Sequence, residues 1–185
     1  MIIGLTGRIA AGKGKIVDFL SSKGFEYYTI SKVVREEAER LGLAITRDEL
    51  QNIGDLIRKK EGAGAWAKRL IKKFDKNKSY IVDGIRNPGE IKELRKCKNF
   101  HLIAIDAPQK IRFERMLKRA KPSDPVTWEE FIKIDERDYE DKDNPLGQQV
   151  GLCMKQADFI IENNTDLEEL DNKIKKIYSG VACKS

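Results

Sequence analysis

Histidine and cysteine are scarce in this sequence, which contains one histidine, His101, and three cysteines. Cys97, Cys153 and Cys183 are far apart, odd in number and without a C-x-x-C pair. A zinc site made of cysteine and histidine ligands is therefore not expected, and neither is acid–base or nucleophilic catalysis by histidine. The chain also lacks the H-x-E and P-C-x-x-C signatures of zinc-dependent deaminases.

Long apolar segments are missing as well. No segment approaches the roughly 20 apolar residues that a membrane-spanning helix needs. Arg8 interrupts the apolar amino-terminal run, so a signal peptide is not expected either. We therefore expect no membrane partner and a cytoplasmic protein with reduced thiols.

Repeats, low-complexity linkers and abrupt changes of composition are absent too, so residues 1–185 are expected to form a single domain. With 40% hydrophobic and 36% charged residues, the chain should be globular with a heavily charged exterior. Its net charge of +6 suits anionic partners such as nucleotides or nucleic acid, and it equally suits a solvated lysine-rich surface.

Short apolar segments alternate with amphipathic ones along the chain. Strands are predicted over residues 1–5, 25–30, 79–83, 101–106 and 158–162. Helices are predicted over residues 13–22, 32–41, 46–60, 63–75, 108–119, 128–140 and 166–178. Ser31 is the expected cap of the second helix, and Thr46, Thr127 and Thr165 each begin a capping box. This alternation favours a parallel five-stranded sheet between two layers of helices, an α/β/α arrangement.

The turn after the first strand matches the pattern G-x-x-x-x-G-K and consists of Gly7, Arg8, Ile9, Ala10, Ala11, Gly12 and Lys13. Glycines let successive backbone N–H groups point inward, and the following helix adds its positive amino-terminal end. Lys13 then supplies a point charge to the β and γ phosphates of a nucleotide. The sequence therefore predicts the P-loop nucleoside triphosphate hydrolase fold and a nucleotide site that continues into Gly14 and Lys15.

A second informative segment, Ile81–Arg86, ends a predicted central strand. The Asp83 carboxylate should emerge on the ligand edge, where it could contact a metal or water or act as a base. Arg86 offers a fork that suits a phosphate group, and Gly84 leaves room for a close backbone approach. The alternative is a plain strand end with a turn and a surface arginine.

This combination resembles the nucleoside monophosphate kinase family, whose members carry an Asp-Gly-x-x-Arg-like segment in this place, and the resemblance extends over nearly the whole chain. Ser31–Arg35 resembles the start of the acceptor-binding helix, in which Arg35 would hold the acceptor phosphate. Arg112–Arg115 with Arg119 resembles the helix that leads into the lid, and Asp135–Asp138 its far side. Ala157–Asn164 resembles the last strand and the nucleotide-base loop.

Within that family the sequence is most similar to a group related to CMP and AMP kinases, and to kinase-like domains found beside some deoxycytidylate deaminases. Dephospho-CoA kinases and phage deoxynucleotide kinases are more distantly similar. The resemblance implies ATP as donor, Mg²⁺ as cofactor, an acceptor-binding segment over about 31–76 and a lid over about 119–145. Arg115 would contact the donor nucleotide.

The spacing of the lid arginines supports the same interpretation. Arg112, Arg115 and Arg119 are three and four residues apart, so they share one helix face. With Arg137, they could neutralise the transferring phosphoryl group, or they could form a solvated face with ion pairs. Arg58 is a weaker candidate for the acceptor pocket and is expected at the surface. The acidic run Asp135–Asp143 is expected to be a solvated helix face.

The motif departs from the family pattern in one respect. Gly14 and Lys15 stand where P-loop proteins carry a Ser or Thr that holds Mg²⁺. Adenylate-kinase-type enzymes also have glycine after the lysine, but it is usually followed by threonine. Mg²⁺ would then be held by phosphates, water and a carboxylate such as Asp83.

The leading hypothesis is an ATP-dependent nucleoside or deoxynucleoside monophosphate kinase. Lys13, Asp83, Arg86, Arg119 and Arg137 are the candidate catalytic residues. Ser31, Arg35, Arg58 and Arg86 are the candidates for acceptor binding. One alternative is a dephospho-CoA kinase, and another is a nucleotide-binding switch without a small acceptor. Two phosphate clamps argue against a switch and against nucleic acid as a partner, whereas the acceptor's base and sugar, the donor's base and the oligomeric state stay open.

Overall fold

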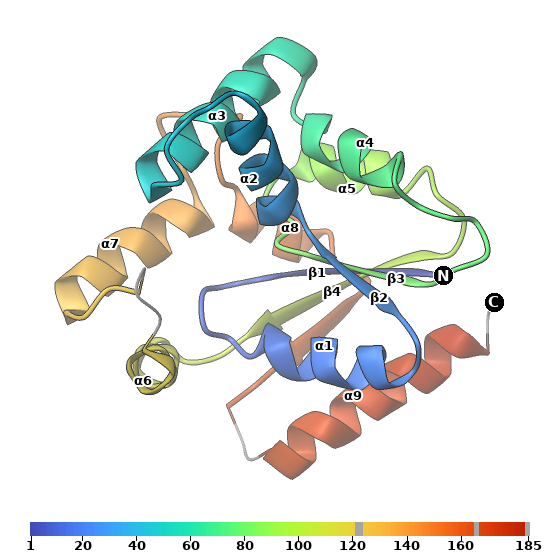
Figure 1. Cartoon of the computed structure of the whole chain (residues 1–185). Helices are drawn as coiled ribbons and strands as arrows, with labels where there is room; N and C mark the ends of the chain where they lie inside the picture. The colour runs from blue at the N-terminus through green and yellow to red at the C-terminus, as the bar shows by residue number, and fades with distance from the viewer. Residues whose placement is uncertain (121–123, 165–166, 184–185) are drawn as a thin grey trace.

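A computed structural model describes residues 1–120, 124–164 and 167–183 of the chain. In these ranges one parallel sheet forms the centre of the molecule (Figure 1). Its strands are β1 (Ile2–Gly7), β2 (Glu26–Thr29), β3 (Tyr80–Asp83), β4 (Phe100–Asp106) and β5 (Phe159–Glu162). They lie in the order β2-β3-β1-β4-β5, with every pairing parallel. The first strand therefore lies in the middle, and β3 and β4 flank it.

Helices cover both faces of this sheet (Figure 1). They are α1 (Lys13–Ser22), α2 (Ile30–Arg40), α3 (Arg47–Glu61), α4 (Ala65–Ile71), α5 (Pro88–Leu94), α6 (Gln109–Arg119), α7 (Trp128–Tyr139), α8 (Val150–Lys155) and α9 (Leu167–Ala182). None of these described helices combines the length and apolarity that a bilayer crossing requires.

Two apolar cores separate the layers, because successive side chains of a strand point to opposite faces. Ile3 and Ile81 belong to the core under α1 and α9, where Ile16 and Leu20 are buried. Their neighbours Ile2 and Val82 belong to the core under α2, α3, α4, α5 and α8. The predicted three-layer α/β/α fold with a parallel five-stranded sheet is confirmed.

The helix caps correct one prediction and support others. Thr29, and not Ser31, caps α2, because its Oγ1 accepts a hydrogen bond from the Lys32 N–H at 3.0 Å. Thr46 caps α3, and Thr127 forms the predicted capping box at α7. The predicted cap at Thr165 lies outside the described residues.

Two short helices were not predicted, and one predicted helix is shorter than expected. The helix predicted over 63–75 is only α4, Ala65–Ile71. The unpredicted α5 follows Asn87, which caps it in a capping box with Glu90. The unpredicted α8 follows the segment after α7 and packs near β1 and β4. Of the two, α5 carries Glu90, which binds the backbone of the turn after β3.

Candidate active site

The turn between β1 and α1 has the backbone that a phosphate loop needs. Gly7 and Gly12 have φ of 134° and 115°, values that side chains with a Cβ rarely adopt. A Cβ on Gly7 would lie 2.0 Å from the Ile105 carbonyl oxygen, and one on Gly12 would lie 2.3 Å from Asn163 Nδ2. The loop therefore requires glycine at both ends of the pattern, and it opens directly onto the amino-terminal end of α1.

The Lys13 side chain folds back across this loop. Its ammonium group donates to the carbonyl oxygens of Gly7 at 3.1 Å and Arg8 at 3.3 Å. The ammonium thus lies over the curve of the loop, where it can reach bound phosphates.

Four charged side chains from other elements act on this ammonium. Burial lowers the pKa of Lys13 below its ordinary value, and Arg86 and Arg119 lower it further, whereas Asp83 and Asp138 oppose the decrease. These residues come from the end of β3 and the turn after it, from the end of α6 and from the last turn of α7. Two arginines and two carboxylates from three segments therefore converge on the phosphate loop.

Asp83 is the carboxylate at the end of β3. Its Oδ1 accepts a hydrogen bond from the Gly84 N–H at 2.7 Å, and its Oδ2 accepts one from the Tyr27 hydroxyl at 3.1 Å. Burial and this carboxylate raise the pKa of Tyr27, so the phenol stays a donor at physiological pH. Tyr27 was not a predicted site residue, although its place on β2 in a parallel sheet could have suggested this contact.

Asp83 also fits the expected magnesium ligand. Gly14, near the start of α1, offers no hydroxyl, and the buried Thr6 hydroxyl is used to donate to the Ile85 carbonyl at 2.8 Å. Within the described ranges no cluster of three metal-ligating side chains occurs. Mg²⁺ commonly binds through one or two carboxylates together with substrate phosphates and water. Asp83, a carboxylate at the end of β3 whose charge acts on Lys13, suits that arrangement.

Arg86 reaches across to the lid segment. Its guanidinium donates to Gln148 Oε1 at 2.6 Å and to Asp138 Oδ2 at 3.2 Å. Its side chain is 40% exposed, so it remains accessible to a ligand. Arg86 thus connects the turn after β3 to α7 through the anionic Asp138 and to the segment before α8 through the neutral Gln148.

The backbone of this turn is held by Glu90, which is completely buried. One oxygen of Glu90 accepts from the N–H groups of Arg86 at 2.9 Å and Asn87 at 3.2 Å, and the other from Arg58 at 3.1 Å. The prediction that Arg58 lies at the surface is wrong: it is 6% exposed and pairs with Glu90 and Asp55. It supports Arg86 instead. An Asn-x-x-Glu signature at α5 could have pointed to Glu90.

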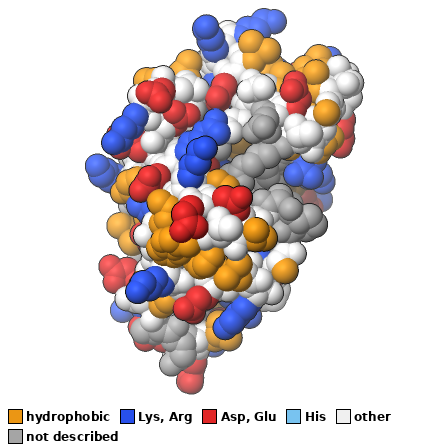
Figure 2. Space-filling view, turned by 90° about the vertical axis from the view of Figure 1, so that its left-hand side faces the viewer, with side chains coloured by type: hydrophobic (Ala, Val, Ile, Leu, Met, Phe, Trp, Pro, Cys, Tyr) orange, Lys and Arg blue, Asp and Glu red, His pale blue; other side chains and the backbone are white. Residues whose placement is uncertain are grey.

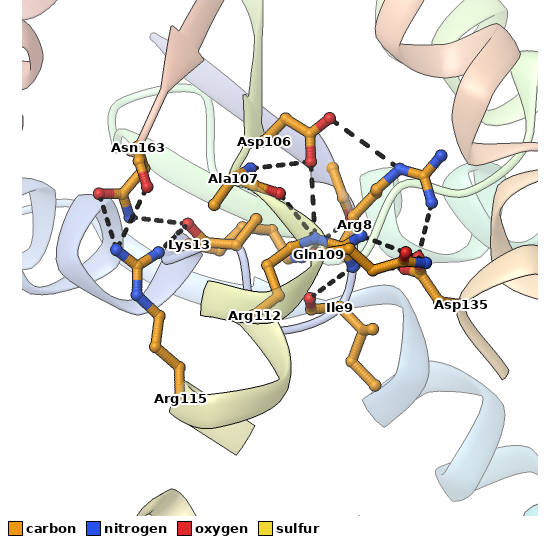
Figure 3. A network of polar contacts seen from close by, with 12 residues as sticks. Arg8, Ile9, Lys13, Asp106, Ala107, Gln109, Arg112, Arg115, Asp135 and Asn163 are labelled. Atoms are coloured by element: carbon orange, nitrogen blue, oxygen red, sulfur yellow. Dashed lines mark hydrogen bonds and ion pairs between the residues drawn. The ribbon is translucent and has the colours of Figure 1, made fainter. Parts of the chain in front are cut away.

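A second buried carboxylate, Asp135, organises the lid side (Figure 3). It accepts from Arg112 at 2.5 and 2.8 Å and from Arg8 at 2.6 Å. The prediction that residues 135–143 form a solvated face is wrong for Asp135 and Asp138, which are both buried. Phe131, Asp135 and Asp138 lie four and three residues apart, so they share the inner face of α7.

Comparisons with known proteins place the sequence among proteins named UPF0200. The UPF0200 protein PH1008 of Pyrococcus horikoshii is 34% identical over 188 residues, which cover 98% of this chain and 97% of that protein. The chain belongs to the UPF0200 family. The profile of a family described as an AAA domain also matches residues 6–133 of this UPF0200 member.

Solved structures similar to this UPF0200 member include several kinases. A shikimate kinase from Aquifex aeolicus has a TM-score of 0.56 at 21% identity, with 100% of both chains covered. A dephospho-CoA kinase from Campylobacter jejuni has a TM-score of 0.57 at 16% identity, with 97% and 96% covered. At these identities the likeness establishes the fold, which is that of P-loop kinases.

Arg115 and Asn163 form one wall of the phosphate loop in this UPF0200 member. The Asn163 side chain donates to the Ala11 carbonyl at 2.7 Å, and Arg115 donates to the same carbonyl at 3.3 Å (Figure 3). Arg115 also donates to the Asn163 backbone carbonyl at 3.2 Å, and burial lowers its pKa. The predicted donor-side arginine therefore lies directly at the phosphate loop.

Of the remaining candidates, only Arg119 acts on Lys13. Arg119 donates to both carboxylate oxygens of Asp124 at 2.6 and 2.8 Å while its charge still acts on Lys13. Arg35 is exposed on α2 and Arg137 is exposed on α7. Neither is among the charges that lower or raise the pKa of Lys13. Ser31 is also exposed, and its hydroxyl lies 3.1 Å from that of Thr29.

Arg137 lies along an open depression of about 900 Å³ on the flank of α7. Arg8, Lys133, Glu136 and Tyr139 also line it. Figure 2 views this side of the molecule, and its described surface shows basic and acidic side chains interspersed rather than separated by sign. This pattern is unlike the basic stripe that a nucleic-acid surface presents.

Proposed function

We propose that this UPF0200 member is an ATP-dependent kinase that transfers the γ-phosphoryl group to the phosphate of a nucleoside or deoxynucleoside monophosphate. The observation that carries the proposal is that two arginines from different elements, Arg86 in the turn after β3 and Arg119 at the end of α6, act on the ammonium group of Lys13 in the phosphate loop. Phosphoryl transfer needs positioning and neutralisation of charge more than covalent catalysis. Two arginines around one P-loop lysine supply the positive charge for two phosphate groups.

The proposed roles follow from these positions. Lys13 and the N–H groups of the loop hold the ATP phosphates. Arg119 and Arg137 belong to the lid and neutralise the phosphoryl group during transfer. Arg86 and Arg35 hold the acceptor phosphate. Asp83 would hold Mg²⁺, which would neutralise charge on the ATP phosphates. In this scheme residues 31–76 receive the acceptor and residues 119–145 close over it, within one domain of 185 residues.

The surroundings of Asp83 favour a phosphate over a hydroxyl as the acceptor. A hydroxyl acceptor needs a base within hydrogen-bond reach, whereas a monophosphate already carries its negative charge. Asp83 has one oxygen held by Gly84 and the other by Tyr27, which suits a fixed anion better than a base. The carboxyl end of β2 offers the hydroxyls of Thr29 and Ser31 and no carboxylate.

A dephospho-CoA kinase activity is the second candidate, since a solved dephospho-CoA kinase shares the fold over 97% of this chain. A screen of nucleoside monophosphates, deoxynucleoside monophosphates and dephospho-CoA with radiolabelled ATP separates the two. We expect label on a monophosphate and its loss in Lys13→Ala. Label on dephospho-CoA alone favours the second candidate. ATP hydrolysis that RNA or protein stimulates, with the label recovered only in inorganic phosphate, contradicts both and favours a nucleotide switch.

A further inference from the structure

The inner face of α7 carries a carboxylate that is shared by two arginines from different segments. The Asp135 side chain is 0% exposed and accepts hydrogen bonds from Arg8, Arg112 and Gln109, the last at 3.3 Å. Figure 3 shows the guanidinium groups of Arg8 and Arg112 both directed at this carboxylate. One buried anion thus joins the phosphate loop, α6 and α7.

Both arginines make further contacts that fix their geometry. Arg112 also donates to the Ile9 carbonyl in the phosphate loop at 3.3 Å and to the Ala107 carbonyl at 2.8 Å. The Arg8 guanidinium lies 3.9 Å from the centre of the Tyr139 ring, near the end of α7. The phosphate loop is therefore connected to α7 through Arg8 and to α6 through Arg112.

A buried cluster of this kind is not explained by stability alone. Removing a carboxylate and two guanidinium groups from water is costly, and apolar residues of similar volume often stabilise a protein as well or better. What the cluster adds is geometry, because a carboxylate binds guanidinium groups in defined directions. Asp106 approaches the same arginines at 3.9 and 3.8 Å and helps to balance their charge.

We infer that Asp135 is a positioning residue for phosphoryl transfer, an inference that rests on the proposed function. Asp135 acts through Arg8 and Arg112 to fix the position of α7 relative to the phosphate loop. Arg112 and Arg119 lie on one face of α6, two turns apart, so the ion pair that fixes Arg112 also sets where Arg119 lies relative to Lys13. Asp135 itself does not touch the reacting atoms.

Three variants test this role. Asp135→Asn keeps the shape but removes the charge, and because it leaves Arg112 buried without its anion, it could fail to fold. Arg8→Met avoids this problem, because Arg8 is 22% exposed and the Arg112–Asp135 pair stays intact. Glu136→Gln, next in sequence and exposed, is the matched control.

The first measurement needs no acceptor. ATP should slow amide hydrogen exchange in residues 128–139 of the wild type and of Glu136→Gln, but not of Arg8→Met or Asp135→Asn. The second measurement is steady-state kinetics with the acceptor found by the screen. Arg8→Met and Asp135→Asn should each lower kcat by about 10²-fold, the cost of a displacement near 1 Å. KM for ATP should change much less.

The double variant decides whether Asp135 acts through Arg8. If it does, Arg8→Met with Asp135→Asn should be no slower than the slower single variant. Three results would each overturn the inference. The first is a double variant whose decrease in kcat is the product of the two single decreases, and the second is a wild-type kcat in both single variants. The third is amide hydrogen exchange in α7 that ATP does not slow in the wild type. A wild type that shows the exchange effect but phosphorylates no monophosphate contradicts the proposed function alone.

Discussion

Replacing Glu90 by glutamine should destabilise the whole acceptor side of the protein, although the substitution hardly changes the size of the side chain. Glu90 is 0% exposed and receives three hydrogen bonds, two from the backbone of the Arg86 turn and one from Arg58. The oxygen of a glutamine can accept from either the backbone N–H groups or Arg58. Its NH₂ group, which is itself a donor, then faces the donors that remain. Arg58 loses its buried anion at the same time.

The size of the effect follows from these contacts. Breaking a buried ion pair by removing one partner costs about 3–5 kcal/mol. Asp55 still pairs with Arg58 at 3.2 Å, so we expect a loss near the lower end, about 3 kcal/mol. For a chain of 185 residues this corresponds to a decrease in Tm of roughly 6–12 °C.

Thermal and urea unfolding followed by circular dichroism measure this loss. The matched control is Glu93→Gln on the same helix, because Glu93 pairs with the exposed Lys68 and Lys96. Such surface pairs contribute little, so the control should unfold at nearly the wild-type temperature. If Glu90→Gln unfolds together with Glu93→Gln, the buried carboxylate does not hold the turn and the reasoning about Arg86 fails.

Three further predictions concern the phosphate loop. Lys13→Ala should lower kcat by about 10²–10³-fold in the acceptor assay, and a normal turnover would exclude the assignment. Gly12→Ala places a Cβ 2.3 Å from Asn163 Nδ2 in a left-handed backbone, so it should lower Tm with a cost of about 1–3 kcal/mol, whereas Gly14→Ala has open space and should not lower it. Because burial lowers the pKa of Lys13, the cationic form is lost at a lower pH than usual, so kcat/KM for ATP should fall as pH rises, below the ordinary lysine value of 10.5. This alkaline decrease should be absent in Lys13→Arg, and its persistence there would assign it to another group.

Much of the fold could be predicted from the sequence because the strands are short, apolar and bounded by turns. The phosphate loop could also be predicted from the sequence, because its backbone requires glycine at fixed positions. The two short helices α5 and α8 escaped prediction because seven and six residues are too few to show a helical period. For α2, the sequence offered two hydroxyl residues near the start, and only the structure shows that Thr29 accepts the capping bond.

The site was harder to predict where charged residues are buried. Charged residues on a helix usually lie on its solvated face, so the sequence gives no sign that Arg58, Asp135 and Asp138 are buried. Their burial depends on partners that are distant in sequence. Arg58 meets Glu90 across 32 residues, and Arg112 meets Asp135 across 23. The helical spacing from Phe131 predicts that Asp135 lies on the same side of its helix. The spacing does not predict which arginine pairs with Asp135.

The contact between Asn163 and the phosphate loop joins two segments that are far apart in the sequence. The Asn163 amide reaches the Ala11 carbonyl across 152 residues and closes the wall of the loop. A growing polypeptide therefore exposes the Gly7–Lys13 segment long before its last wall has been synthesised. Any chain that stops short of β5 contains the complete sequence motif without the enclosed loop, so competence to hold a nucleotide should arise only after the carboxyl-terminal strand has joined the sheet.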